Sequence, residues 1–165
     1  MSESPGPSGD LVFHVVRHAH ALERAAWGED DMRRPLSEKG RRQADALAEQ
    51  LAACAPTTLW SSPARRCQAT LEPLAQRARL GIETLELLAE GSSGGSVLDA
   101  LVQHASMRNS LVACTHGDVI ASLLEAAARR GASVSPPQLL PKAGTWQIVV
   151  RDAIVTSAQL LKLGS

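Results

Sequence analysis

Three short polar segments of this sequence contain histidine and arginine side chains that suit phosphate chemistry. They are Arg17-His18-Ala19-His20, Ser61-Ser62-Pro63-Ala64-Arg65-Arg66 and His116-Gly117-Asp118. Guanidinium groups bind the oxygens of a tetrahedral anion through paired N–H donors. A neutral imidazole beside them can attack phosphorus and form a phosphohistidine, while the cations stabilise the charge on the phosphoryl oxygens in the transition state. The same cations lower the pKa of the imidazole, which keeps the nucleophile unprotonated.

Each polar segment follows a short apolar run that is typical of a buried β-strand, over residues 11–16, 57–60 and 110–115. Ligands of open α/β sheets bind at the carboxyl ends of the strands. We therefore expect the three segments to meet at one rim of a sheet. A helix that begins near Gly117 would add free backbone N–H groups and the positive end of its dipole to the same place.

Helical patterns separate the predicted strands. Ser37 is a suitable N-cap for a helix over 37–53, and Pro73 is expected to kink or split the second helix. The other expected elements are helices over 63–78, 97–105 and 119–130, a weak strand over 82–88, and a hairpin of strands 145–150 and 154–157 that turns at Arg151-Asp152. This alternation predicts a three-layer α/β/α fold with a mostly parallel sheet and an antiparallel edge.

Length and composition limit the classes of protein. The chain has 165 residues, 17 basic and 17 acidic, which fits one domain over 11–165 after a disordered lead-in over 1–10. A neutral chain with 2 % aromatic residues is unlike proteins that bind nucleic acids by basic surfaces and base stacking. The sequence contains neither a membrane span nor a signal peptide pattern. Three widely spaced cysteines argue against disulfides and zinc, and favour the cytoplasm.

Four motifs, in this order, resemble those of the histidine phosphatase superfamily, also called phosphoglycerate-mutase-like. The family has Arg-His-Gly after the first strand, an Arg-Pro-Leu-Ser/Thr segment that opens the first helix, a Ser-Ser-Pro-x-x-Arg segment, and a late His-Gly. The similar segments here are Arg17-His18-Ala19, Arg34-Pro35-Leu36-Ser37 with its continuation to Ala44, residues 61–70, and Thr115-His116-Gly117. The resemblance covers about residues 12–150 and implies a phosphoglycerate-mutase-like fold.

The resemblance also implies roles for individual residues. His18 would be the phosphorylated nucleophile and His116 a second catalytic residue. The residues implied to bind the phosphoryl group are Arg17, Arg66 and His116. No metal and no other cofactor is implied. The general acid of the family lies between the second helix and the late strand, where Glu90 of Glu90-Gly91 is the best match and Glu86 is the rival; some short members have no clear acid.

Departures from the family pattern indicate which branch of the family this chain resembles. Ala19 replaces the family glycine, and the segment 21–27 lacks the Ser-x-Trp-Asn of the mutases. The chain between Gly81 and Ser110 is too short for a large lid, whereas a mutase must shelter its phosphoenzyme from water. The chain is more similar to the short SixA-type phosphohistidine phosphatases and to the phosphatase-like domains that follow some Nudix hydrolases. The segments 114–120 and 142–146 resemble the latter group in particular.

The leading interpretation is a metal-independent phosphatase that hydrolyses a phosphomonoester or a protein phosphohistidine through phospho-His18. A metal site made of His18, His20, His116 and Asp118 is the first alternative, and it is disfavoured by the arginines beside it. A non-catalytic domain that binds a phosphorylated ligand and a mutase-type phosphotransferase are the others. The sequence leaves open whether the substrate is a phosphohistidine protein, a nucleotide or a sugar phosphate, and it does not set the oligomeric state.

Overall fold

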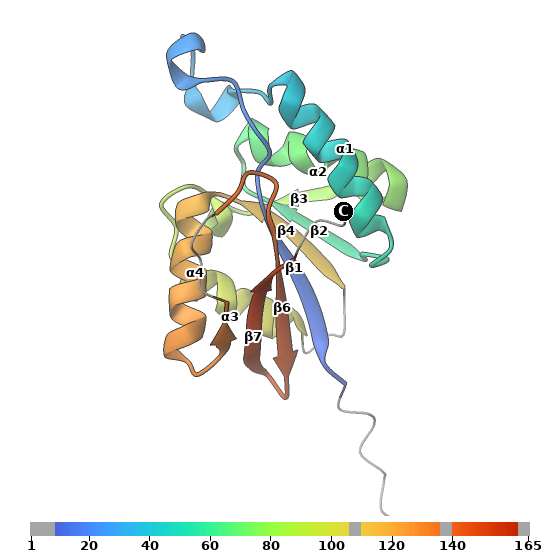
Figure 1. Ribbon diagram of the computed structural model, residues 1–165, viewed down its shortest axis with the longest axis vertical. Coiled ribbons are helices and arrows are strands. Elements are labelled where there is room, and N and C mark those ends of the chain that lie inside the picture. Colours follow the sequence, from blue (N-terminus) through green and yellow to red (C-terminus); the bar gives the residue numbers. More distant parts are fainter. Residues whose placement is uncertain (1–8, 106–109, 136–139, 162–165) are drawn as a thin grey trace, which may run out of the picture.

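A seven-stranded β-sheet forms the centre of the part of the chain that the computed structural model describes, residues 9–105, 110–135 and 140–161 (Figure 1). The strand order is β3-β2-β4-β1-β6-β7-β5. The strands are β1 (Leu11–Arg17), β2 (Thr58–Ser61), β3 (Ile82–Thr84), β4 (Leu111–Thr115), β5 (Ser133–Val134), β6 (Thr145–Arg151) and β7 (Ile154–Leu160). The predicted lead-in, 1–10, lies outside the described residues except for its last two positions.

The strands that precede the three polar segments are neighbours in the parallel half of the sheet. Strand β4 pairs in parallel with β1 on one side and with β2 on the other. The register sets Arg17 opposite Thr115 and Ser61 opposite Cys114. The carboxyl ends of the three strands are therefore level, and the polar residues that follow them emerge at one rim of the sheet, as predicted.

Helices cover both faces of the sheet, with α1 (Glu38–Ala52) and α2 (Arg65–Ala78) on one face and α3 (Gly94–Ala105) and α4 (Gly117–Arg129) on the other (Figure 1). Successive residues of β1 point to opposite faces. Accordingly, Val15 packs in the core beneath α3 and α4, and Val16 packs in the core beneath α1 and α2. The predicted three-layer α/β/α fold is confirmed. No helix within the described ranges is both long and apolar enough to cross a membrane.

The antiparallel edge is also confirmed, with small changes. Strand β6 runs antiparallel to β1, and β7 runs antiparallel to β6. Their hairpin turns at Asp152 and Ala153, both with positive φ (51° and 62°), so the predicted turn at Arg151-Asp152 is one residue too early. Such left-handed turns match the twist of a hairpin. Strand β5, which pairs in parallel with β7, was not predicted because two residues are too few for a periodic pattern.

Three helices or strands differ from the sequence-based expectation. Helix α2 contains Pro73 but is not split, because its buried face, which includes Leu71 and Leu74, stays packed on both sides of the proline. The expected strand over 82–88 is shorter, since β3 ends at Thr84 and a 3₁₀ turn (Glu86–Leu88) follows it. Helix α3 begins at Gly94, three residues earlier than predicted, inside the Gly/Ser-rich segment.

Close packing of two helices explains the early start of α3. A Cβ atom on Gly94 would lie 1.9 Å from the backbone nitrogen of Leu123 in α4. The neighbouring Gly95 has no such limit, because the nearest atom to a Cβ there would be 3.5 Å away, at the end of the Arg130 side chain. The glycine that lowers helix propensity in the sequence is therefore the one that lets α3 and α4 touch.

We predict that Gly94→Ala lowers the free energy of unfolding by about 1–3 kcal/mol, because the methyl group overlaps the backbone of α4 and the two helices must separate. Gly95→Ala is the matched control. It should leave stability unchanged or raise it by up to about 1 kcal/mol, since alanine is the better helix former. Urea denaturation of the three proteins measures the difference, and equal stabilities would contradict the close approach of α3 and α4.

Candidate active site

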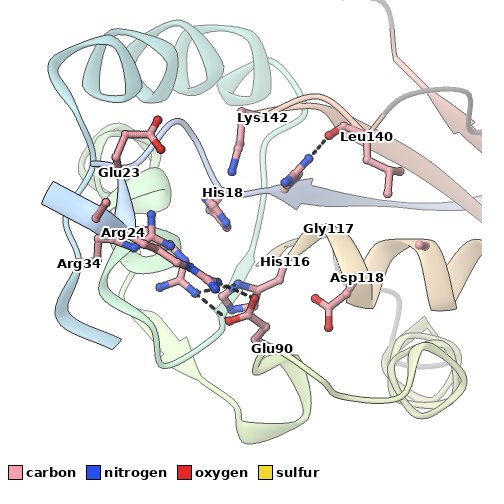
Figure 2. Close-up of a pocket in the computed structure, with 14 residues that line it drawn as sticks. His18, Glu23, Arg24, Arg34, Glu90, His116, Gly117, Asp118, Leu140 and Lys142 are labelled. Atoms are coloured by element: carbon pink, nitrogen blue, oxygen red, sulfur yellow. Dashed lines mark hydrogen bonds and ion pairs between the residues drawn. The ribbon is translucent and has the colours of Figure 1, made fainter. Parts of the chain in front are cut away.

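A pocket of about 570 Å³ opens where the carboxyl ends of β1 and β4 meet the first turns of α2 and α4 (Figure 2). All five residues that the sequence analysis assigns to a site line this pocket. Arg17 and His18 stand at the end of β1, Arg66 in the first turn of α2, and His116 at the N-cap of α4. Glu90 belongs to the loop between the 3₁₀ turn and α3. The fold thus brings together side chains that are up to 99 positions apart in the chain (116 minus 17).

His18 has one defined tautomer. Its side chain is buried, and its Nδ1 lies 2.9 Å from the carbonyl oxygen of Ala19. A carbonyl oxygen can only accept a hydrogen bond, so Nδ1 carries the proton and Nε2 keeps its lone pair. Burial is the main cause that lowers the pKa of His18 to about 3. The hydrogen bond to the Ala19 carbonyl raises this pKa, whereas Lys142, His116 and Arg66 lower it further. The imidazole is therefore neutral at physiological pH.

Ala19 is fully buried. The family that the sequence resembles has glycine at this position. Its methyl group lies in a small apolar cluster with Leu36, Ala44 and Ala143. Its N–H donates to the hydroxyl of Thr70 at 2.9 Å. The neighbouring residues are small enough to accept the extra methyl group, and the backbone at this point holds the His18 ring through the Ala19 carbonyl.

Two guanidiniums keep buried N–H donors at the pocket. Arg66 is 1 % exposed and donates from Nη1 to the carbonyl oxygen of Asp31 at 2.9 Å. Arg17 donates from Nη1 to the carbonyl oxygen of Leu140. Within the described residues, the Nε atoms of both arginines are buried and have no acceptor. A buried donor without an acceptor is costly, and both of these arginines line the pocket.

His116 lies between Arg66 and His18. Its Nε2 lies 2.8 Å from the hydroxyl oxygen of Ser62, and Nη2 of Arg66 lies 3.5 Å from its Nδ1. Because a guanidinium can only donate, Nδ1 accepts and Nε2 donates to Ser62. The rings of His116 and His18 are 5.4 Å apart and inclined by 67°. Helix α4 begins at Gly117, directly after His116, so its N-terminus also faces the pocket.

Carboxylates neutralise part of this positive charge. Glu90 forms ion pairs with Arg66 and Arg24, each at 3.2 Å. Asp31 pairs with Arg66 at 3.3 Å and with Arg34 at 2.9 Å. Burial alone would raise the pKa of Asp31, but the hydrogen bond from Arg34 and the nearby guanidiniums lower it. The two carboxylates hold the guanidiniums in place as fixed ion pairs.

His20, which the metal alternative invokes, and Glu86, the rival general acid, lie outside the pocket lining. His20 turns to the first turn of α1, where its Nδ1 lies 2.6 Å from the hydroxyl of Ser37. Glu86 stands in the 3₁₀ turn and is not part of the lining. Asp118 does line the pocket, and its carboxylate accepts from the N–H of Gly91 at 2.8 Å. Among residues 9–105, 110–135 and 140–161, no three His, Cys, Asp or Glu side chains are grouped to hold a metal ion.

The pocket is also lined by three cations that were not predicted from the sequence, namely Arg24, Arg34 and Lys142. Arg34 begins the motif over 34–44, so its presence could have been inferred from the resemblance. Lys142 belongs to the segment 142–146, which the sequence analysis noted only for its similarity to one branch. Nothing in the sequence marks Arg24, because it reaches the pocket through the irregular segment between β1 and α1.

Comparison with known proteins identifies related sequences. Residues 13–96 match the family model of the histidine phosphatase superfamily (branch 1). A curated relative from Mycolicibacterium smegmatis, an 8-oxo-(d)GTP phosphatase, is 37% identical over 151 residues. The match covers 89% of this chain and 47% of the relative. The chain therefore spans about half the length of that protein.

Solved structures share the fold at low sequence identity. The protein histidine phosphatase SixA in complex with tungstate has a TM-score of 0.72 at 19% identity, over 92% of this chain and 94% of that chain. A SixA protein from Agrobacterium tumefaciens has a TM-score of 0.70 at 22% identity, over 92% and 96%. A mycobacterial glucosyl-3-phosphoglycerate phosphatase has a TM-score of 0.66 at 17% identity, over 92% and 97%. The predicted phosphoglycerate-mutase-like fold is confirmed by these likenesses.

We predict that Arg66→Ala lowers kcat/KM for any phosphorylated substrate about 10²–10³-fold, the usual effect of losing one donor to a transition-state oxyanion. Arg65→Ala is the matched control. Arg65 is exposed, points away along α2 and pairs with Glu72, so its loss should change kcat/KM less than twofold. Steady-state assays compare the two variants. Equal losses would mean that the helix presents a different side to the pocket.

Proposed function

The chain belongs to branch 1 of the histidine phosphatase superfamily, and we propose that it is a phosphatase that hydrolyses its substrate through a phosphohistidine on His18 without a metal ion. The observation that carries this proposal is the single tautomer of His18. Its Nδ1–H is fixed on the Ala19 carbonyl, so the lone pair of Nε2 is available beside two arginines with unpaired buried donors.

The reaction has two displacements at phosphorus. In the first, Nε2 of His18 attacks, an N–P bond forms and the P–O or P–N bond to the leaving group breaks. In the second, a water molecule attacks the phosphohistidine and releases inorganic phosphate and the neutral imidazole. The groups proposed to bind the phosphoryl oxygens in both steps are Arg17, Arg66 and His116. They act mainly through charge, because phosphoryl transfer spreads negative charge over the equatorial oxygens.

Glu90 is the proposed general acid for substrates with a poor leaving group. Its carboxyl group lines the pocket and pairs with Arg66. A phosphoryl group that binds Arg66 would compete with Glu90 for the guanidinium, which frees the carboxyl group to take a proton and pass it to a departing alkoxide. Glu86 is the weaker candidate, because it lies outside the pocket lining.

The proposed substrates are a phosphorylated small molecule or a protein phosphohistidine. The proteins that share this fold differ in the substrates that their names give, from protein phosphohistidine to glucosyl-3-phosphoglycerate. The curated relative adds a nucleotide. Nucleic acids are not proposed as partners, since the chain has no net charge and only 2 % aromatic residues. No membrane partner is proposed. A cytoplasmic location is proposed on the free thiols of Cys54, Cys67 and Cys114.

We predict that His18→Ala abolishes phosphate release from a panel of phosphomonoesters, nucleotides and a phosphohistidine protein. Without Nε2 no covalent intermediate forms. Wild type incubated with ³²P-labelled substrate and quenched in base should carry the label on His18, as mapped by peptide mass spectrometry. His20→Ala, which changes a histidine outside the pocket, should still be labelled.

Label on another residue would remove His18 from the role of nucleophile. Wild type that binds phosphorylated ligands but releases no phosphate would favour the non-catalytic alternative, and isomerisation of phosphoglycerate without phosphate release would favour the mutase. Activity should persist after dialysis against EDTA. Loss of activity in EDTA that a divalent ion restores would favour the metal alternative.

We predict that Glu90→Gln slows hydrolysis of alkyl phosphates about 10²-fold, the usual contribution of a positioned acid. It should barely change hydrolysis of p-nitrophenyl phosphate or phosphohistidine, whose leaving groups need little help from a proton. Asp31→Asn is the matched control, because Asp31 also pairs with Arg66. Any effect of that variant should be the same for both kinds of substrate. An equal effect of Glu90→Gln on both would mean that Glu90 only positions Arg66.

A further inference from the structure

The segment from Leu140 to Gly144 is fastened by its backbone to the end of β1. The N–H of Ala143 lies 3.0 Å from the carbonyl oxygen of Arg17 and 3.2 Å from that of His18. In return, the N–H of Arg17 donates to the carbonyl oxygen of Gly144 at 2.9 Å. The Arg17 guanidinium donates to the Leu140 carbonyl. The segment and the nucleophile therefore form one hydrogen-bonded unit, and neither can shift alone.

A tight turn within this unit fixes the direction of Lys142. Ala143 has a positive φ of 60°, an uncommon conformation for a residue other than glycine. Gly144 donates to the Pro141 carbonyl at 2.9 Å, and a Cβ atom on it would lie only 2.8 Å from that oxygen. Lys142 precedes these two residues, and Figure 2 shows its side chain extending into the pocket toward His18.

Lys142 is half-buried in a region of positive charge. Burial lowers the pKa of Lys142, and so does repulsion from Arg17, Arg34 and Arg66. Among the described residues, the carboxylate that raises this pKa is that of Glu23, whose side chain is 81% exposed. An ammonium group held among guanidiniums with so little compensation is unfavourable unless an anion binds there.

Three pocket arginines are already compensated by carboxylates. Arg66 has the carboxylates of Asp31 and Glu90, and Arg24 has the same two. Arg34 pairs with Asp31 and donates to the Leu22 carbonyl at 2.7 Å. Among the residues described, Lys142 takes part in no such ion pair. Two cations of the pocket thus have no ion pair within the described residues, Lys142 and Arg17, and of these Arg17 has the negative charge of Asp118 nearby.

We propose that Lys142 is a further catalytic residue, whose ammonium group binds an oxygen of the phosphoryl group while it is transferred to and from His18. The proposal rests on the proposed phosphoryl transfer at His18. The ligand class is a tetrahedral or trigonal-bipyramidal oxyanion with a charge of at least two, since two positive charges, those of Arg17 and Lys142, face it. A compact ammonium group suits this place because it acts as a point charge and needs no planar partner.

Anion binding tests the proposal without relying on turnover. Calorimetry should measure the Kd of orthovanadate and of inorganic phosphate for wild type, Lys142→Met, Lys142→Arg and the control Lys39→Met, which removes an exposed lysine of α1. We expect Lys142→Met to weaken vanadate binding and lower kcat/KM about 10²-fold, the effect of losing one oxyanion donor. Lys142→Arg should restore part of both, and Lys39→Met should match wild type.

The pH profile separates a charge in the reaction from a structural role. The groups that face Lys142 are Arg17, Arg34, Arg66, His18 and Glu23. Since the pKa of Lys142 is lowered, kcat/KM of wild type should fall at alkaline pH earlier than an ordinary lysine would allow. A guanidinium stays charged there, so Lys142→Arg should move this fall to higher pH. A lysine that only supports the turn would leave the alkaline side unchanged.

The outcomes distinguish this proposal from the proposed function. If Lys142→Met binds vanadate and turns over substrate within twofold of wild type, Lys142 is not a phosphoryl ligand, while phosphatase activity through His18 stands. If wild type binds phosphate but hydrolyses nothing, the proposed function fails. In that case weaker binding by Lys142→Met, but not by Lys39→Met, still supports Lys142 as a ligand of the anion.

Discussion

Mutual repulsion among the cations around His18 is the constraint on which the arrangement of this pocket depends. Arg66 and Lys142 both act on the buried imidazole, and Arg17 and Arg66 repel Lys142, at a place where charges are screened far less than in water. The chain offsets the repulsion with the carboxylates of Asp31 and Glu90 and with backbone carbonyl groups. The charges that repel one another in this pocket are those that a phosphoryl group can satisfy.

The fold supplies the groups of the pocket from segments that a sheet alone would not bring together. Strand β1 stands between the parallel half of the sheet and the antiparallel edge. Its carboxyl end therefore receives groups from both sides, namely His116 after β4 and the Leu140–Gly144 segment before β6. The irregular segment between β1 and α1 adds Asp31 and Arg24. A central strand is a suitable place for the proposed nucleophile, His18, because both of its neighbours can position charge around it.

Sequence reasoning finds the part of the site that depends on strand ends and fails for the part that depends on irregular backbone. Arg17, His18, Arg66 and His116 follow directly from apolar runs or from a helix start, and the sheet brings them together. The proton position on His18 depends on one carbonyl, that of Ala19, which has no signature in the sequence. Lys142 owes its direction to the positive φ of Ala143, and single residues in left-handed backbone cannot be predicted from a pattern of residue types.

The fold was predicted with the same strengths and gaps. Continuous apolar runs identified β1, β2 and β4, which are buried on both faces. Helical periodicity identified the four α-helices of the described ranges, because each of them buries one face. It misplaced the start of α3, where the contact of Gly94 with α4 outweighs the low helix propensity of glycine. Propensity also overstated the effect of Pro73, since the packed face of α2 compensates for one missing hydrogen bond. In each case a tertiary contact decided against a local preference.

Access of water to the pocket favours hydrolysis over transfer to a second substrate. The side chains at the rim are open to solvent, with Glu23 81% and Arg24 65% exposed, whereas His18 beneath them is buried. Helix α3, which follows the Glu90 loop, packs against α4 beside the sheet and not over the pocket. A phosphohistidine on His18 would therefore lie below an opening that water can enter. An enzyme that returns the phosphoryl group to its substrate must exclude water from that intermediate, so a pocket with this rim is suited to phosphate release.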